Sequence, residues 1–256
     1  PKRAEKSAEK VEAPPAHQES EKEWRIDSVE RLNHDSLSIV LHAMSSSFIR
    51  DEPGDLWHLD VIKEGALFED ELKRSYTPLS TIEEYKQGII RLMIKVYVTG
   101  KMTSYLASLR PCSSLLVSPP LATVQLEALE GLVMVAGGSS VTVALQACKS
   151  VLARYPMGVP VHLALCNRTV EDVLYQDALE SLVQEHAGFS LQHCISGGPL
   201  PPANDNCRIA WKKGRISRED IEEKTAPTMR AVVSGPPGLC EAVVRIWQGI
   251  GRDPER

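Results

Sequence analysis

One stretch decides the fold of this chain: Gly131-Leu132-Val133-Met134-Val135-Ala136-Gly137-Gly138-Ser139-Ser140-Val141-Thr142. Its first part is an apolar run with the length and composition of a fully buried strand, and the run ends in two glycines. From residue 142 to residue 154, apolar residues then recur at helical spacing. A buried strand that passes through glycines into a helix is typical of a βα unit, which predicts a mostly parallel sheet with helices on its faces.

The sequence downstream continues this alternation. Residues 161–166 and 230–235 are apolar strand patterns, while residues 172–186 and 238–248 have the spacing of amphipathic helices. Strands that alternate with helices in this way predict βαβ units. We therefore expect a Rossmann-like α/β domain over residues 121–256.

The sequence upstream has a different pattern. Residues 24–32, 37–41, 57–62 and 89–98 are short strand patterns separated by turn-forming residues, with almost no helical periodicity between them. Closely spaced short strands predict a small antiparallel barrel, here over residues 23–120. The fold class expected for the whole chain is thus α+β with two domains, an antiparallel β-barrel followed by the α/β domain.

Residues 1–22 are charged and rich in Ala and Pro, and Val11 is their only large aliphatic residue. Such a segment cannot bury enough apolar surface to order itself, so we predict a disordered, solvated tail, with docking on a partner left open. The sequence begins at Pro1 rather than at a methionine, which a processed leader, a removed anchor or a trimmed sequence would each produce.

The composition excludes several classes of function. The net charge is −5 and the pI is near 5.9, unlike a nucleic-acid-binding surface. No run of 18 apolar residues is present, so no membrane span is expected. The six cysteines form no C-x-x-C pair and the seven histidines form no ligand-like pattern, so no metal site is expected. The scattered cysteines suit a reducing compartment.

Two segments of the predicted barrel carry residues suited to a phosphorylated ligand. They read Arg74-Ser75-Tyr76-Thr77-Pro78-Leu79-Ser80 and Lys95-Val96-Tyr97-Val98-Thr99-Gly100-Lys101-Met102-Thr103-Ser104-Tyr105-Leu106. A guanidinium fork matches phosphate oxygens, so Arg74 is a candidate phosphate ligand. Gly100 precedes a predicted helix, whose N-terminal amides would face an anion.

These segments resemble motifs of the ferredoxin-reductase superfamily, and most of all NADH–cytochrome b5 reductases. The first resembles the R-x-Y-(S/T) flavin signature and the second the K-x-Y-x-x-G-x-(M/L)-(S/T)-x-x-L segment. Residues 132–142 resemble the strand and G-G-T-G-I-T-P loop of the nucleotide domain, residues 167–174 its N-x-T-x-x-D-I-L stretch, and residues 232–238 its C-G-P-P strand end. The resemblance spans residues 24–250, approximately, and implies a flavin-binding barrel followed by a nicotinamide-nucleotide domain.

The resemblance also implies the residues of each site. FAD would be bound by Arg74, Tyr76, Thr77, Ser80, Lys95, Tyr97, Gly100, Lys101, Met102 and Thr103. The nucleotide would be bound by Gly137, Gly138, Ser139, Thr142, Asp172, Gly235, Pro236 and Pro237. Thr77 and Ser234 would act in catalysis. A carboxylate at Asp172 would hold ribose hydroxyls and favour NADH over NADPH, whereas Arg168 nearby weakens that preference because an arginine accepts a 2′-phosphate.

Three positions depart from the family pattern. Ser140 replaces a loop glycine, Val143 replaces a proline at the helix start, and Ser234 replaces the cysteine that lies near the nicotinamide in the family. The family also has a G-P-x-G stretch between the domains and a terminal strand ending in an aromatic residue, and neither is evident here. The nucleotide motifs are therefore less well kept than the flavin motifs.

Two functions remain open at this point. One is an FAD-dependent oxidoreductase that passes electrons from NADH to a one-electron acceptor such as a cytochrome. The other is a reductase-like structural subunit of a larger assembly, with a mitochondrial location left open, that keeps flavin with little or no NADH turnover. The expected partners are accordingly an electron-acceptor protein or neighbouring subunits, in an intracellular, reducing compartment. A missing N-terminal part would allow a mitochondrial or membrane-associated location.

Overall fold

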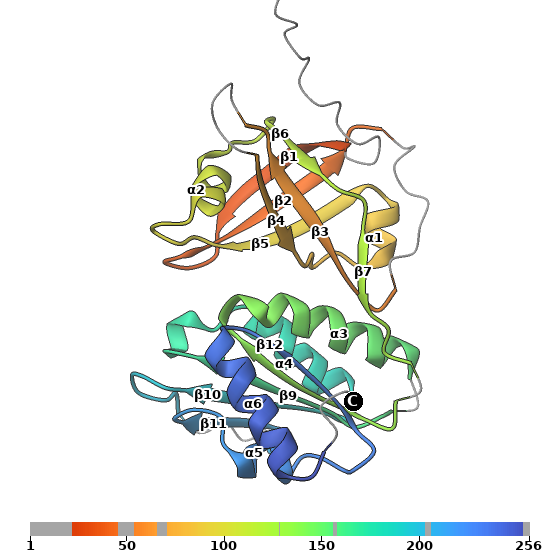
Figure 1. Cartoon of the computed structure of the whole chain (residues 1–256), viewed down its shortest axis with the longest axis vertical. Helices are drawn as coiled ribbons and strands as arrows, with labels where there is room; N and C mark the ends of the chain where they lie inside the picture. The colour runs from red at the N-terminus through yellow and green to blue at the C-terminus, as the bar shows by residue number, and fades with distance from the viewer. Residues whose placement is uncertain are drawn as a thin grey trace, which may run out of the picture.

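The computed structural model contains one antiparallel sheet and one parallel sheet (Figure 1). It describes residues 22–45, 54–65, 71–127, 129–155, 158–202 and 206–252. The first sheet is antiparallel, with the order β4-β3-β6-β1-β2-β5 and β7 paired to β3. Its strands are β1 (Lys22–Arg31), β2 (Ser36–Ala43), β3 (Leu56–Lys63), β4 (Leu72–Tyr76), β5 (Ile89–Lys95), β6 (Ser114–Val117) and β7 (Leu121–Val124). Two short helices, α1 (Ile82–Lys86) and α2 (Lys101–Ser108), pack on it.

The antiparallel sheet curls around its own apolar core. Alternate residues of β1 and β2 point inward, so that Trp24, Ile26, Ile39 and Leu41 are at most 2% exposed. Tyr85 of α1 closes one end of the core, with its ring stacked 6.1 Å from that of Trp24. The period-two pattern of the sequence is thus explained by one buried and one wetted face.

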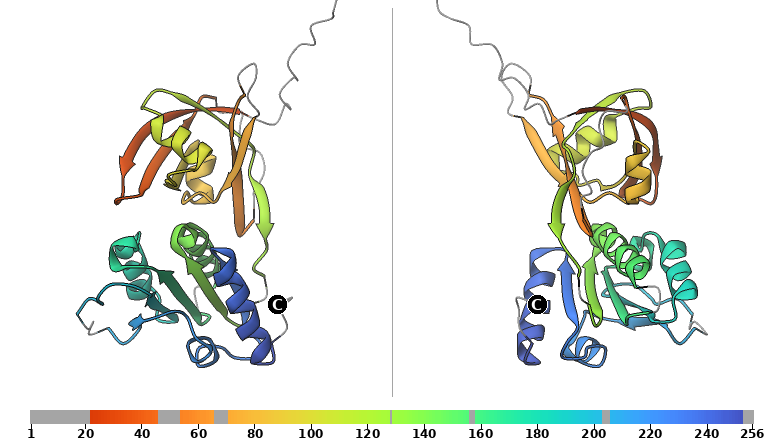
Figure 2. Two further views of the ribbon diagram at one scale, coloured as in Figure 1. Left: turned by 60° about the vertical axis from the view of Figure 1, so that its left-hand side comes forward. Right: turned by 90° about the vertical axis from the view of Figure 1, so that its right-hand side faces the viewer.

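The second sheet is parallel, with the order β11-β10-β9-β8-β12. Helices cover both of its faces (Figure 2), with α3 and α4 on one side and α5 and α6 on the other. The strands are β8 (Leu132–Gly137), β9 (Val161–Asn167), β10 (Phe189–Ile195), β11 (Ile209–Lys213) and β12 (Arg230–Ser234). The helices are α3 (Val141–Arg154), α4 (Gln176–Glu185), α5 (Arg218–Glu222) and α6 (Pro237–Gly249).

The predicted fold class is confirmed, and several boundaries differ from those predicted. The first sheet extends through β7, past the boundary expected at residue 120. β5 ends at Lys95 rather than at residue 98, because a turn closed by the Gly100 amide and the Tyr97 carbonyl follows it. α4 begins at Gln176 rather than at residue 172, because Tyr175 adopts a left-handed conformation. β10 and β11 were not predicted. The predicted tail lies outside the described residues except for Lys22, which begins β1.

One buried carboxylate fastens the two domains to each other. Asp55, just before β3, is 3% exposed. Its oxygens accept hydrogen bonds from Ser150 Oγ at 2.5 Å, from Arg154 Nη1 at 2.8 Å and from the Leu126 amide at 2.7 Å. Burial alone would raise the pKa of Asp55, but these hydrogen bonds and the charge of Arg154 hold it below its ordinary value.

The same face of α3 makes a second connection to the barrel one turn earlier. The Gln146 side chain accepts from the Trp57 amide at 2.8 Å and donates to the Pro78 carbonyl at 3.2 Å. Gln146, Ser150 and Arg154 recur every four residues, so they lie along one stripe of the helix. This stripe fixes α3 against the barrel. Within the described residues, no helix is long and apolar enough to cross a membrane.

Asp55→Ala should lower the free energy of unfolding by about 2 kcal/mol, because it leaves the buried Leu126 amide without its acceptor and removes the hydrogen bonds from Ser150 and Arg154. Urea titration measures the change. The matched control is Asp27→Ala, an exposed carboxylate of β1 whose removal should change the free energy by less than about 0.5 kcal/mol. Equal effects of the two substitutions would contradict the fastening role of Asp55.

His193 of β10 should make the protein acid-sensitive. The ring is 0% exposed, stacks on Trp211 with 4.0 Å between centroids, and has no hydrogen-bond partner among the described residues. Burial lowers its pKa to about 4. Because the unfolded chain takes up this proton at a pKa of about 6.5, stability present above that pH is lost as the pH falls towards 4.

His193→Phe, which keeps an aromatic ring on Trp211, should therefore reduce the loss of unfolding free energy between pH 7 and pH 5 by about 2 kcal/mol. Urea titrations at the two pH values measure this difference. His162, whose pKa is also lowered to about 4 chiefly by burial, stays in place and keeps part of the acid sensitivity. His42→Gln removes a half-exposed imidazole and serves as the control; if it relieved the loss equally, burial of His193 would not be the cause.

Candidate functional site

Two clefts meet where the domains face each other. The barrel cleft has a volume of about 510 Å³ and lies between β4, β5, the start of α2 and the start of α3. The sheet cleft has a volume of about 1050 Å³ and lies over the carboxyl ends of the parallel strands. Both are lined by Lys95, Tyr97, Ser139 and Ser140. A ligand in one cleft would therefore touch the same side chains as a ligand in the other.

Strand β4 positions the signature residues of the barrel cleft. Arg74 and Tyr76 are two residues apart on the strand, so they project from the same face, and Thr77 follows at the strand end. Arg74 is exposed and lines the cleft. Burial raises the pKa of Tyr76 to about 12, although the nearby Arg74 charge opposes this. The Tyr76 hydroxyl is thus a hydrogen-bond donor at neutral pH.

The start of α2 supplies an anion-binding end to the barrel cleft. Gly100 is the N-cap residue and makes no side-chain cap, and no acidic residue occurs in the first turn. A side chain at Gly100 would meet Thr103 Oγ1 at 2.4 Å, so this position needs glycine. Thr103 Oγ1 accepts from the Tyr97 amide at 3.2 Å and donates to the Gly100 carbonyl at 3.1 Å. The threonine therefore shapes the turn, and the helix amides remain for a phosphate.

The loop between β8 and α3 provides a second end of this kind, at the sheet cleft. Gly138 has φ +57° and no atom within 4 Å of where a side chain would start, so it needs glycine for its backbone conformation. A side chain at Gly137 would meet Leu239 Cδ2 at 2.7 Å. α3 begins with neither a side-chain cap nor an acidic residue in its first turn. Its N-terminal amides favour a negatively charged group.

The substitutions in this loop leave the backbone unstrained. Ser140 has φ −69° and ψ 0°, a right-handed conformation that any residue adopts. Only Gly138, within the segment 137–140, has a positive φ. α3 begins at Val141 without the family proline. Ser140 therefore takes the place of the family glycine without backbone strain, and it adds a hydroxyl to both clefts.

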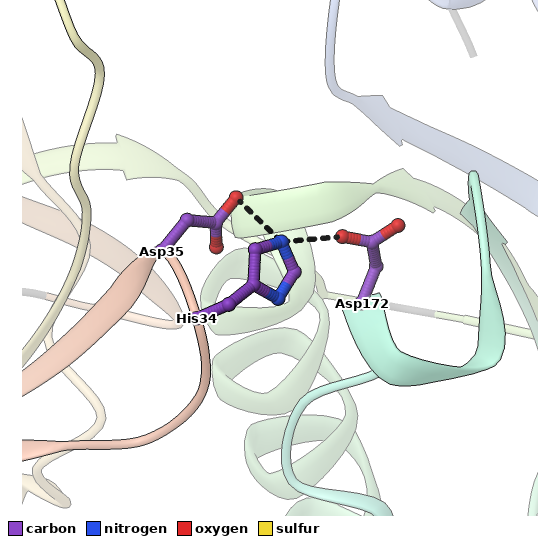
Figure 3. Close-up of side chains that lie close together, drawn as sticks. All are labelled: His34, Asp35 and Asp172. Atoms are coloured by element: carbon purple, nitrogen blue, oxygen red, sulfur yellow. Dashed lines mark ion pairs between the residues drawn. The ribbon is translucent and has the colours of Figure 1, made fainter.

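At the mouth of the sheet cleft, three ionisable side chains from both domains come together (Figure 3). His34 Nε2 lies 3.5 Å from Asp35 Oδ2 and 3.6 Å from Asp172 Oδ1. Their candidate ligand atoms lie within 4.8 Å of one another, a spacing open to a divalent cation. Asp35, however, is already paired with Lys95 Nζ at 2.7 Å. Burial would raise the pKa of Asp35, but hydrogen bonds from Lys95 and Ser36 and the positive charge of Lys95 hold it below its ordinary value.

The structure brings most of the predicted site residues together. The barrel cleft is lined by Arg74, Tyr76, Thr77, Lys95, Tyr97, Gly100, Lys101, Met102, Thr103, Ser139 and Thr142. The sheet cleft is lined by Gly137, Gly138, Ser139, Asp172, Gly235, Pro236 and Pro237. Thr142 thus faces the barrel side rather than the sheet side, where it was expected.

Two predicted residues lie outside both linings. Ser80 is 3% exposed, and its Oγ accepts from the Arg91 amide at 2.7 Å, so it ties α1 to β5. Ser234 ends β12, and the residues that follow it, rather than Ser234 itself, line the sheet cleft. Ser80 therefore stabilises the barrel itself, and Ser234 lines neither of the two clefts.

Sequence reasoning missed several lining residues of the sheet cleft. These are His34, Asp35, Cys166, Cys194, Ser196, Gly214, Arg215 and Ile216. The basic segment 211–216 contains the end of β11, and its last residues line the cleft. The available signal was its position after a strand, because ligands of open α/β sheets bind at the carboxyl ends of the strands.

The residues present fit a flavin dinucleotide in the barrel cleft. An unpaired helix start and Arg74 would face phosphates, and Tyr76 and Tyr97 offer aromatic surface. Tyr97 is 53% exposed and Val98 is fully exposed, so apolar surface beside the cleft is left for a ligand to cover. The sheet cleft has the glycine loop and helix start that suit a second dinucleotide.

Comparison with known proteins agrees with both assignments. Residues 25–126 match the oxidoreductase FAD-binding domain family, and residues 134–245 match the oxidoreductase NAD-binding domain family. Among curated relatives, NADH-cytochrome b5 reductase 1 of Dictyostelium discoideum is 29% identical over 188 residues, and that of Aspergillus terreus is 27% identical over the same length. Each alignment covers 71% of this chain and 62% of the relative, so this chain spans about three fifths of their length.

A solved structure extends the likeness to nearly the whole chain. The cytochrome b5 reductase domain of Ulva prolifera nitrate reductase superimposes with a TM-score of 0.78 at 20% identity. The superposition covers 94% of this chain and 97% of that domain. The order of a barrel and a parallel-sheet domain is thus shared with that domain.

Arg74→Gln should weaken FAD binding about ten- to a hundredfold, because a charge-assisted hydrogen bond to phosphate is lost. Flavin fluorescence titration of the apoprotein measures the dissociation constant. Arg110→Gln removes an exposed arginine outside both clefts and should leave the constant unchanged. Equal weakening by the two substitutions would remove Arg74 from the site.

Proposed function

Because the chain belongs to the ferredoxin-reductase superfamily, with an FAD-binding oxidoreductase domain followed by an NAD-binding one, we propose that it is a cytochrome b5 reductase-like enzyme. It takes electrons from a nicotinamide nucleotide and delivers them singly to an acceptor such as a cytochrome. The chemistry of transfer is supplied by the bound flavin, which accepts a hydride and releases single electrons. The protein supplies binding, orientation and electrostatics.

The observation that carries this proposal is the common lining of the two clefts. Lys95, Tyr97, Ser139 and Ser140 border both, so no more than these side chains lies between a ligand at that end of the barrel cleft and one in the sheet cleft. Direct transfer between two cofactors needs this contact, since reacting atoms must approach to roughly 3–3.5 Å. A pair of clefts that served storage or structure alone would not need to share lining residues.

Named side chains divide the work. Arg74 and the start of α2 would hold the phosphates of FAD, and Tyr76 and Thr77 would orient its ring. The loop from Gly137 to Ser139 and the start of α3 hold the phosphates of the nucleotide. The turn from Gly235 to Pro237 lines the sheet cleft and would contact the nucleotide there. Ser139 and Ser140 offer hydroxyl groups at the junction of the two clefts, where they would form hydrogen bonds with either ligand.

The acceptor is proposed to be a small electron-transfer protein of the cytochrome type. The curated relatives carry the name NADH-cytochrome b5 reductase, which is the basis for this proposal. No comparison supports the alternative of a reductase-like structural subunit, and the unstrained Ser140 removes one reason for it. The exposed Lys101 at the edge of the barrel cleft is a surface on which an acidic acceptor would dock.

The test is anaerobic mixing of the FAD-loaded protein with NADH or NADPH in a stopped-flow spectrophotometer. The flavin absorbance should bleach within seconds with at least one nucleotide. Val124→Ala, which trims an exposed side chain of β7 outside both clefts, should bleach at the unchanged rate and serves as the control. A flavin band that persists with both nucleotides would overturn the proposed function.

A further inference from the structure

We infer that the sheet cleft contains a subsite for the 2′-phosphate of an adenosine nucleotide, formed by Arg168 and Arg215, and that the protein therefore prefers NADPH to NADH. The inference rests on the proposed function, since it names which nucleotide the sheet cleft takes. It reverses the preference for NADH that the sequence suggested through Asp172.

The strand register places the two arginines around one point. Asn167, Ile195 and Lys213 are neighbours in register at the carboxyl ends of β9, β10 and β11. Pairing continues past the strand ends, because the Gly197 amide donates to the Arg168 carbonyl at 2.6 Å and the Gly214 amide to the Ile195 carbonyl at 2.8 Å. Arg168 and Arg215 thus flank the end of β10 from either side.

The distances suit one phosphate group between them. Neighbouring strands lie about 4.8 Å apart, so β9 and β11 are separated by about 10 Å. Two arginine side chains that start this far apart can reach a common phosphate. Both residues line the sheet cleft, as does Ser196 at the end of β10, which adds a hydroxyl. In dinucleotide-binding sheets the residue after the second strand reads the adenosine ribose, and Arg168 follows β9, which is the second strand of this domain and the first after the glycine loop.

The positive charge of these arginines is not neutralised inside the protein. Both side chains are exposed, and among the described residues neither has an ion-pair or hydrogen-bond partner. A guanidinium presents paired donors that match phosphate oxygens bidentately. Two unpaired guanidinium groups at one edge of a cleft favour a ligand that brings additional negative charge there.

The carboxylates of the cleft, by contrast, are already engaged. Asp35 is paired with Lys95. Asp172 Oδ2 accepts from the Thr169 amide at 2.9 Å and from Thr169 Oγ1 at 3.1 Å, which closes a capping box, and its Oδ1 faces His34 (Figure 3). A carboxylate that reads ribose hydroxyls must offer its oxygens to the ligand. Asp172 offers them to its own turn and to the barrel.

The test is equilibrium binding to two probes that differ only in one phosphate, 2′,5′-ADP and 5′-ADP, measured calorimetrically on the FAD-loaded protein. We expect 2′,5′-ADP to bind at least about tenfold more tightly. Arg168→Gln and Arg215→Gln should each reduce this ratio severalfold, while 5′-ADP affinity changes by less than about twofold. Arg245→Gln, which removes an arginine of α6 outside the cleft, should leave the ratio unchanged.

Equal affinity for the two probes, or substitutions that weaken both probes alike, would overturn the subsite. Flavin reduction distinguishes this failure from that of the proposed function. If NADH reduces the flavin as fast as NADPH at subsaturating concentration, the proposed preference for NADPH is wrong and the proposed oxidoreductase function is supported. If neither nucleotide reduces the flavin while 2′,5′-ADP still binds more tightly than 5′-ADP, the 2′-phosphate subsite is supported and the proposed oxidoreductase function is wrong.

Discussion

A single buried carboxylate, Asp55, holds the arrangement on which both clefts depend. It accepts hydrogen bonds from Ser150 and Arg154 of α3 and from the Leu126 amide in the connection between the domains. Together with the hydrogen bonds of Gln146 one turn earlier, Asp55 holds one face of α3 against the barrel. Since α3 also begins at the glycine loop, its position decides where Ser139 and Ser140 stand relative to Lys95 and Tyr97. The two clefts meet because α3 is bound to the barrel near its middle by Gln146 and near its C-terminal end by Ser150 and Arg154.

Polar contacts suit this role better than apolar ones would. An apolar interface of the same size tolerates sliding, whereas bonds from one carboxylate to an arginine, a serine and an amide are satisfied in one geometry only. Leu56 and Met93 of the barrel do join the core of the second domain, so burial contributes the affinity between the domains. The bonds to Asp55 and Gln146 then select the register. A shift of one helical turn would leave a buried charge unpaired, which costs several kcal/mol.

The features that sequence predicted well are those set by neighbours along the chain. The apolar run before Gly137 is a buried strand under almost any packing, and Arg74 and Tyr76 share a face because strands alternate. The features that it missed depend on residues far apart. β10 carries Gln192 and His193 in its interior, and these are tolerated because Asp220 accepts from one and Trp211 stacks on the other. His34 meets Asp172 only because the domains close on each other.

Asp172 shows why a motif gives the residue type but not its role. A carboxylate after the second strand suits ribose recognition, and the same carboxylate suits the cap of a short helix. Here Thr169 occupies one of its oxygens and His34 faces the other, so its negative charge is largely used within the protein. Arg168, four residues earlier in the chain, has no such partner among the described residues. The charge that recruits a ligand is the charge that remains after internal pairing, and in this cleft that remainder is positive.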